Sequence, residues 1–346
     1  MPKRRFSIYS FFLFFFLIGV IACNRTKSEK QIAISDTTHQ VLSDDRTTEE
    51  KDLTRLITQS PDKPENYHNR AKYYIKERKL DEAYLDLGKA FELDSANESF
   101  LITLSDYYLT AMEPSKSRAV LTDLIKENPK NAEAHLKMGE LFFYGKKYDQ
   151  SFEAINNALR IDKYLSKAYF FKGMNYKETG NLEKAESSFQ TAAEQNPDYF
   201  DAYMQLGLLK TKVNSKMAIQ YFTSAINTEP KNLDALYARG YEYQISDDFD
   251  KAIQDYTKII QLKPSYTDAH FNLGYIHYNL DLPKEAIKDF EKVVQYAPED
   301  PKGYYMRGLC HEANAENQLA LTDYRKALNL RSDYELASKA ITRLEK

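Results

Sequence analysis

The feature that most constrains this chain is a set of small, large apolar and proline residues that recurs with a period of 34 residues. In the clearest unit, residues 166–199, these marks stand at unit positions 4, 8, 11, 20, 24, 27 and 32, as Tyr169, Gly173, Tyr176, Ala185, Phe189, Ala192 and Pro197. They return in phase as Leu236, Gly240, Tyr243, Ala252, Tyr256, Ile259 and Pro264, and again as His270, Gly274, His277, Ala286, Phe290, Val293 and Pro298. A unit this short cannot bury its apolar face alone, so the period predicts a stacked array and not a set of separate compact domains.

Counting by register gives eight units that together cover residues 64–334. Their ranges are 64–97, 98–131, 132–165, 166–199, 200–232, 233–266, 267–300 and 301–334. The second unit has Pro114 between its two expected helices, which predicts a hairpin that packs differently from the others. The fifth is one residue short, and we place the deletion in the turn near Asn214.

Each recurring mark has a physical reason. A small residue at position 8 allows the two helices of a unit to approach closely, and a glycine there must repay a cost of about 1 kcal/mol relative to alanine in a helix interior. These residues are Ala71, Gly139, Gly173, Gly207, Gly240, Gly274 and Gly308. Large residues at positions 4, 11 and 24 are expected to fill the space between the helices. The prolines near position 32 lack the N–H that a continuing helix needs, so they end the second helix.

This pattern resembles the tetratricopeptide repeat (TPR), a pair of antiparallel helices that stacks into a superhelix. The resemblance implies an all-α fold: an α-solenoid of about eight helix-turn-helix repeats that form a right-handed superhelix. Residues 335–346 follow the last repeat and place Ala337, Ala340, Ile341 and Leu344 at helical spacing. They are expected to form a C-terminal capping helix over the last repeat.

The N-terminus has the character of a targeting segment. Lys3, Arg4 and Arg5 precede an apolar run from Phe6, and small residues stand just before Cys23. This arrangement resembles the lipobox of bacterial lipoproteins, which implies that residues 1–22 are a signal peptide and that Cys23 carries the lipid. A signal-anchor helix over residues 6–22 and a plain cleaved signal peptide are the alternatives.

The segment after the cysteine is polar, with charges of both signs, so residues 23–48 are expected to form a flexible tether and residues 49–346 the solenoid. Removal of the signal peptide changes the formal net charge from −3 to −6, because three basic residues and no acid are lost. A chain this acidic is poorly suited to binding nucleic acid. We expect the protein to lie in the cell envelope, anchored to a membrane by the lipid. Some lipoproteins have an Asp directly after the cysteine that retains them in the inner membrane; this chain has Asn24 at that place, which favours the outer membrane. The sequence specifies neither the side of the membrane, periplasm or cell surface, nor the oligomeric state.

The TPR resemblance also implies a binding site, because positions 2, 5, 9 and 12 of the first helix usually face the concave groove. Positions 4, 7, 8 and 11 already face the partner helix, so the groove residues are not expected to be needed for packing within a unit; packing against the neighbouring unit is the alternative. Here these positions predict an apolar, tyrosine-rich groove lined by Phe143, Phe170, Met174, Met204, Leu208, Tyr237, Tyr241, Phe271, Tyr275, Tyr278 and Tyr305. Lys167 and Lys302 stand at position 2, but their repeats are apolar at positions 5 and 9, which disfavours capture of a terminal carboxylate. A hydrophobic or extended peptide, or a partner's helix, is the expected ligand.

The sequence therefore favours a membrane-anchored scaffold or adaptor of the bacterial cell envelope that binds proteins. A lipoprotein that captures glycans or nutrients on a TPR-like scaffold is the alternative. An enzyme is not expected, because Cys310 and His311 are adjacent on a helix and point about 100° apart, and no nucleotide or metalloprotease motif is present. His270 and His277 fall at core positions, and no cofactor or metal is expected.

Overall fold

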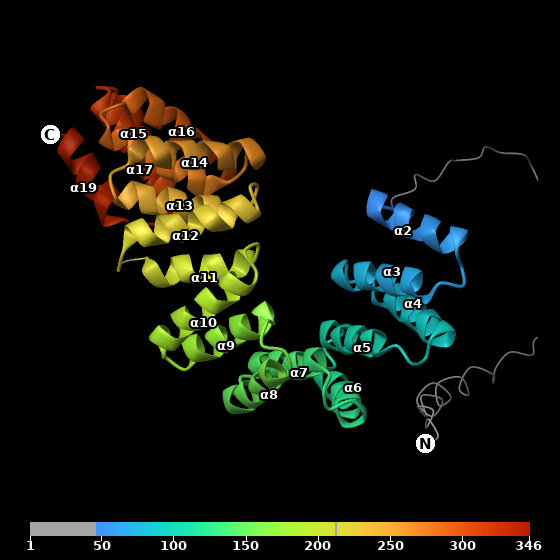
Figure 1. Ribbon diagram of the computed structural model, residues 1–346. Coiled ribbons are helices and arrows are strands. Elements are labelled where there is room, and N and C mark those ends of the chain that lie inside the picture. The colour runs from blue at the N-terminus through green and yellow to red at the C-terminus, as the bar shows by residue number, and fades with distance from the viewer. Residues whose placement is uncertain (1–45, 212) are drawn as a thin grey trace, which may run out of the picture. The chain divides into compact units, whose positions relative to one another are not determined.

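The computed structural model describes residues 46–211 and 213–346. The expected signal peptide, Cys23 and most of the expected tether lie outside these residues. Within the described part, the chain forms eighteen helices and no strand, which confirms the all-helical repeat fold (Figure 1). None of the described helices is both long and apolar enough to cross a membrane.

Sixteen of the helices form eight antiparallel pairs. The first helices are α3 (Pro64–Lys76), α5 (Glu98–Thr110), α7 (Ala132–Tyr144), α9 (Ser166–Glu178), α11 (Phe200–Lys210), α13 (Leu233–Ile245), α15 (Thr267–Asn279) and α17 (Pro301–Ala313). The second helices are α4 (Leu80–Leu93), α6 (Pro114–Glu127), α8 (Tyr148–Ile161), α10 (Leu182–Gln195), α12 (Ser215–Thr228), α14 (Phe249–Leu262), α16 (Pro283–Tyr296) and α18 (Asn317–Leu330). Every first helix begins at the residue where the period starts a new unit. Local chemistry fixes several of these starts, since the side chains of Asn97, Asn131 and Asn232 accept hydrogen bonds from the first turns of α5, α7 and α13.

The turn between the two helices of a repeat is almost invariant. Its fifteenth position has a positive φ, between 55° and 83°, in seven repeats: Arg78, Met112, Lys146, Gly180, Asp247, Asp281 and Ala315. The second repeat has this turn too, and Pro114 is simply the first residue of α6, where no N–H is needed. The backbone turn of the second repeat therefore does not differ from the others. In the fifth repeat α11 has 11 residues where the other first helices have 13, and Asn214 caps α12, so the shortening falls near Asn214 as predicted.

The close approach of the two helices occurs where position 8 meets position 24. A Cβ atom on Gly207 would lie 2.4 Å from a ring carbon of Phe222, and one on Gly173 would lie 2.6 Å from the ring of Phe189. Real Cβ atoms do not approach ring carbons this closely, so an aromatic residue at position 24 requires glycine at position 8. The small-residue marks therefore have the role that the sequence predicts.

The chain divides into two compact units, the first ending at Ile161 and the second running from Asp162 to Lys346. The first begins with α2 (Thr48–Gln59), one residue before the expected start of the solenoid at residue 49. In α2, Thr54 accepts a 3.2 Å hydrogen bond from Arg70 of the following helix α3. In α12, the second helix of the fifth repeat, Thr223 accepts the corresponding hydrogen bond from Arg239 of the following helix α13. Thus α2 occupies the place of the second helix of a preceding repeat, which the sequence analysis missed.

The second unit ends with α19 (Glu335–Leu344), where the capping helix was expected. Ala337 and Ala340 are buried there, in a cluster with Tyr324 and Tyr334. Within three repeats an arginine of the first helix binds an aspartate of the second through two hydrogen bonds of 2.7–2.8 Å: Arg70 with Asp86, Arg239 with Asp255, and Arg307 with Asp323. These bidentate pairs add to the apolar contacts that fix the two helices of a repeat against each other.

Candidate interaction surface of the second unit

Three consecutive first helices of the second unit expose large apolar side chains at the same repeat position. Leu208 of α11, Tyr241 of α13 and Tyr275 of α15 stand at position 9 and are 46%, 47% and 41% exposed. Ile245 is 47% exposed and lies one helical turn after Tyr241, on the same face of α13. We call Leu208, Tyr241, Ile245 and Tyr275 the exposed stripe. Aligned apolar side chains on one side of a monomer are typical of an interaction site.

Position 5 behaves differently from position 9. Its ring packs against the ring at position 24 of the same repeat, with centroids 5.6 Å apart for Phe170 and Phe189 and 5.8 Å for Tyr237 and Tyr256. The same pairing joins Phe271 to Phe290 and Tyr305 to Tyr324. The expectation that these residues are not needed for packing within a repeat is wrong for position 5. The reason is that a ring at position 24 extends past the glycine to the neighbouring face of the first helix.

Position 5 also joins consecutive repeats. Phe170 contacts Tyr199, Tyr237 contacts Tyr266 and Tyr305 contacts Tyr334, with ring centroids 5.2–6.0 Å apart. Each of these partners stands just before the next helix begins. The alternative use of the groove residues, packing against the next unit, therefore applies to part of the set.

Polar groups surround the stripe. The Asn272 side-chain N–H donates to the Tyr237 hydroxyl at 3.2 Å, and the Tyr256 hydroxyl donates to Gln244 at 2.9 Å. Burial raises the pKa of Tyr237, while the hydrogen bond from Asn272 acts in the opposite direction. The half-buried Tyr237 hydroxyl is neutral at neutral pH and can bind a polar group of a peptide next to the apolar stripe. Tyr256 is fully buried, and its hydroxyl stabilises the repeat itself.

A row of carboxylates lies on the same face of the same helices. Asp201, Asp234 and Asp268 stand at position 2 of α11, α13 and α15, and all three are exposed. Within the described residues, none of them forms an ion pair. The pKa of Asp201 is raised, first by the partial desolvation of its carboxyl against the protein surface and second by the nearby carboxylate of Glu229. We call Asp201, Asp234 and Asp268 the acidic edge.

The remaining predicted groove residues of the second unit are half-buried. Met174 and Phe170 belong to the core around Phe189, and Tyr278 belongs to the core around Phe290. Near the C-terminus, Glu312 accepts hydrogen bonds from the Tyr324 hydroxyl at 2.8 Å and from Arg343 of α19 at 2.6 Å. The terminal helix thus fixes the acid that stands at position 12 of the last repeat.

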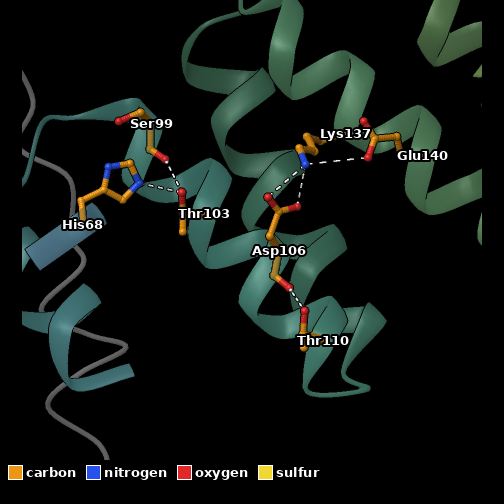
Figure 2. A network of polar contacts seen from close by, with 7 residues as sticks. All are labelled: His68, Ser99, Thr103, Asp106, Thr110, Lys137 and Glu140. Carbon is orange, nitrogen blue, oxygen red and sulfur yellow. Dashed lines mark hydrogen bonds and ion pairs between the residues drawn. The ribbon is translucent and has the colours of Figure 1, made fainter. Parts of the chain in front are cut away.

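The corresponding face of the first unit is polar. Lys137 of α7 binds both carboxylate oxygens of Asp106 of α5, at 2.8 and 2.9 Å, and lies 3.7 Å from Glu140 (Figure 2). On the neighbouring helix pair, His68 of α3 lies 2.7 Å from the Thr103 hydroxyl. Phe143 is half-buried and contacts Tyr144 and Tyr148, so it belongs to this unit and not to the stripe.

The residues considered for catalysis have structural contacts. Cys310 is fully buried beside Phe290, and burial raises the pKa of its thiol to about 12. His311 lies 2.6 Å from Glu316, and His277 lies 2.6 Å from Asp289. His270 is buried, with one ring nitrogen 2.9 Å from the carbonyl oxygen of Pro264. Among residues 46–211 and 213–346, no three His, Cys, Asp or Glu side chains are close enough together to hold a metal ion.

Family models for the tetratricopeptide repeat match most of this helical array. They match residues 64–97, 102–165, 166–199, 240–281, 267–300 and 301–334. The chain belongs to the tetratricopeptide repeat family. The matched ranges 64–97, 166–199 and 301–334 each coincide with one helix pair of the array.

Individual relatives match only part of this TPR protein. Tetratricopeptide repeat protein 13 of Homo sapiens is 28% identical over 156 residues, which are 45% of this chain and 14% of that protein. BBSome complex member BBS4 of Bos taurus is 27% identical over 134 residues, which are 38% of this chain and 26% of that protein. The chain thus spans about a quarter or less of the length of these relatives. The C-terminal part of a TPR repeat-containing protein from Cytophaga hutchinsonii has the same fold, with a TM-score of 0.60 at 18% identity over 69% of this chain and 99% of that one.

Proposed function

We propose that this TPR protein is a scaffold that holds a partner protein through the exposed stripe of its second unit. The observation that carries the proposal is the exposure of Leu208, Tyr241 and Tyr275 at one repeat position on three consecutive helices. Position 5 supports the repeat itself, whereas position 9 is available to a partner. Tyrosine suits such a surface, because its ring offers a large flat contact and its hydroxyl can remain hydrated.

The proposal extends to the location of the protein. The sequence before the first repeat supports a lipid anchor at Cys23 and a place in the bacterial cell envelope, with the scaffold acting there as an adaptor. Several acyl chains on one residue would hold the protein firmly, where a single chain binds only marginally. Replacing Cys23 by Ser is expected to abolish lipid labelling and to release the protein from membranes. Unchanged membrane partition and processing of Cys23→Ser would contradict the anchor.

The binding proposal is tested by substituting Glu at both Tyr241 and Tyr275 in the full chain. Cross-linking in native membranes followed by purification should recover specific partners with the unaltered protein and lose them with the double variant, because two buried charges cannot be desolvated cheaply. The matched control is Tyr144→Glu with Tyr164→Glu, two tyrosines that are 60% and 64% exposed outside the stripe. If the Tyr241 and Tyr275 variant captures partners as well as the control variant does, the binding site lies on another face.

The glycan-binding alternative is distinguished in the same set of proteins. A sugar array is expected to give no retention on the unaltered chain. Retention that the Tyr241 and Tyr275 variant removes would favour a carbohydrate ligand over a protein partner, since sugars also stack on aromatic rings.

A further inference from the structure

The acidic edge and the exposed stripe lie on one face of the same three helices. Asp201, Asp234 and Asp268 each precede the position 9 residue of their helix, Leu208, Tyr241 and Tyr275, by seven residues. Seven residues are close to two helical turns, so the two side chains of each helix lie within about 20° of the same direction. A partner that covers the stripe therefore passes beside the carboxylates.

The charge of this edge is not neutralised within the protein. Several other carboxylates of the second unit have cationic partners, such as Asp255 with Arg239 and Glu186 with Lys210. The three aspartates of the edge have none among the described residues, although Asp234 and Asp268 lie close enough to Tyr266 to raise the pKa of its hydroxyl, after burial. Lys263 lies over the ring of Tyr266, 5.7 Å from its centroid, and forms no ion pair with either carboxylate.

Helix stability alone does not explain the three aspartates. A carboxylate in the first turn of a helix interacts favourably with the helix dipole. The same position is nevertheless lysine in two other first helices of this unit, Lys167 of α9 and Lys302 of α17. An acid at position 2 is therefore not a requirement of the repeat. Within the second unit, an acid at this position occurs on the three helices that expose the stripe. In the first unit, α3 and α7 also have an acid there, Glu65 and Glu133.

We propose that the partner segment bound by the stripe is cationic as well as apolar, with Lys or Arg side chains next to Asp201, Asp234 and Asp268. The apolar side chains of the segment cover the stripe, and its cations satisfy the three unpaired carboxylates. The tyrosine rings attract the same cations through their faces. This inference rests on the proposed function, because it names the chemistry of the partner for the same surface.

The test uses the full chain and three series of labelled synthetic peptides with identical apolar residues. The polar positions are Lys in one series, Gln in the second and Glu in the third, and each series includes one alternating and one helically spaced version. Fluorescence anisotropy at low salt should give binding of the Lys series that is about tenfold tighter than that of the Gln series, as two or three exposed ion pairs provide together. Raising the salt to about 0.5 M should remove most of this advantage, because exposed charges are screened.

Two double variants separate the charge from the apolar contact. Asp234→Asn with Asp268→Asn should weaken the Lys series about tenfold and leave the Gln series unchanged, whereas Tyr241→Ala with Tyr275→Ala should weaken both series. The matched control is Asp250→Asn with Glu285→Gln, two exposed first-turn acids of the second helices α14 and α16, which should change neither. Thermal unfolding of each variant checks that its fold is intact.

The outcomes distinguish this inference from the function on which it rests. Equal binding of the Lys and Gln series, or a Lys series unaffected by the aspartate variant, overturns the cationic partner; if the tyrosine variant still weakens binding, the stripe remains the binding surface. Binding that the tyrosine variant leaves intact overturns both. Failure of all three series to bind also counts against the inference.

Discussion

The two units of this protein use the same face of the same repeat in opposite ways. At position 9 the first unit has Asp106 and Glu140, which surround Lys137, whereas the second unit has Leu208, Tyr241 and Tyr275. In the first unit, Lys137 forms ion pairs with Asp106 of the adjacent first helix and with Glu140, so charges of this face pair with each other. In the second unit, apolar side chains are exposed and carboxylates are unpaired. The comparison teaches that the repeat fixes the backbone, while a few positions decide whether its face is closed or available to a partner.

The interiors of the two units differ in a related way. Position 24 is aliphatic in the first unit, as Leu87, Leu121 and Ile155, and aromatic throughout the second, as Phe189, Phe222, Tyr256, Phe290 and Tyr324. Position 8 also differs in part: the first unit has Ala71, Ser105 and Gly139, whereas every repeat of the second unit has glycine. An aromatic interior needs the glycine and in turn supports an aromatic residue at position 5. The tyrosine-rich face of the second unit is thus built outward from its core.

The largest effect on stability is expected when Lys137, the cation between Asp106 and Glu140, is replaced. Lys137→Met leaves the carboxylate of Glu140, whose side chain is 8% exposed, without its positive neighbour, and should lower the free energy of unfolding by about 3 kcal/mol. Tyr241→Ala, at position 9 of the second unit, should cost about 0.5 kcal/mol, because its side chain is already exposed. Urea denaturation of both variants measures the contrast. Similar losses of stability in the two variants would contradict this difference between the two faces.

A second prediction concerns the interior of the second unit. Gly207→Ala should lower the free energy of unfolding by about 2 kcal/mol, since a Cβ atom would lie 2.4 Å from the ring of Phe222. Adding Phe222→Leu recreates the alanine and leucine pair of the first repeat and should recover part of that loss in a double-mutant cycle. The matched control is Gly88→Ala in α4, where nothing lies within 4 Å, and it should stabilise by up to about 1 kcal/mol. A strictly additive cycle would show that ring and glycine are independent.

The first unit should also be sensitive to acid. Burial, with Lys72 as a second cause, lowers the pKa of His68 to about 4, whereas an unfolded chain has a histidine pKa of about 6.5. Between these values the unfolded state binds more protons, so stability should fall as pH falls from about 6.5 to 4, by about 1.5 kcal/mol between pH 7 and pH 5. His68→Gln should remove this part of the pH dependence. An unchanged pH profile in that variant would contradict a neutral, buried His68.

The smallest effect on stability is expected at the acidic edge. Asp234→Asn with Asp268→Asn should change the free energy of unfolding by less than about 1 kcal/mol, through loss of two exposed first-turn charges. The reason is that the edge has no ion pairs to lose, unlike the charged face of the first unit. A loss as large as that of Lys137→Met would assign these aspartates a structural role and remove the asymmetry between the two units.

The sequence by itself determined the repeat: helix pairs begin at the residues that the 34-residue period marks, because the small residues and prolines act locally, within one hairpin. It also identified position 9 of the second unit as apolar. The sequence analysis was wrong for position 5, because side chains from two repeats pack against the residue there. It also missed that α2 acts as the second helix of a preceding repeat, which is seen in the hydrogen bond from Arg70 to Thr54. The tertiary structure decided which groove residues are exposed and which acids are unpaired. Exposure and ion pairing depend on contacts between residues about 30 positions apart, such as Asp106 and Lys137, and no single repeat contains that information.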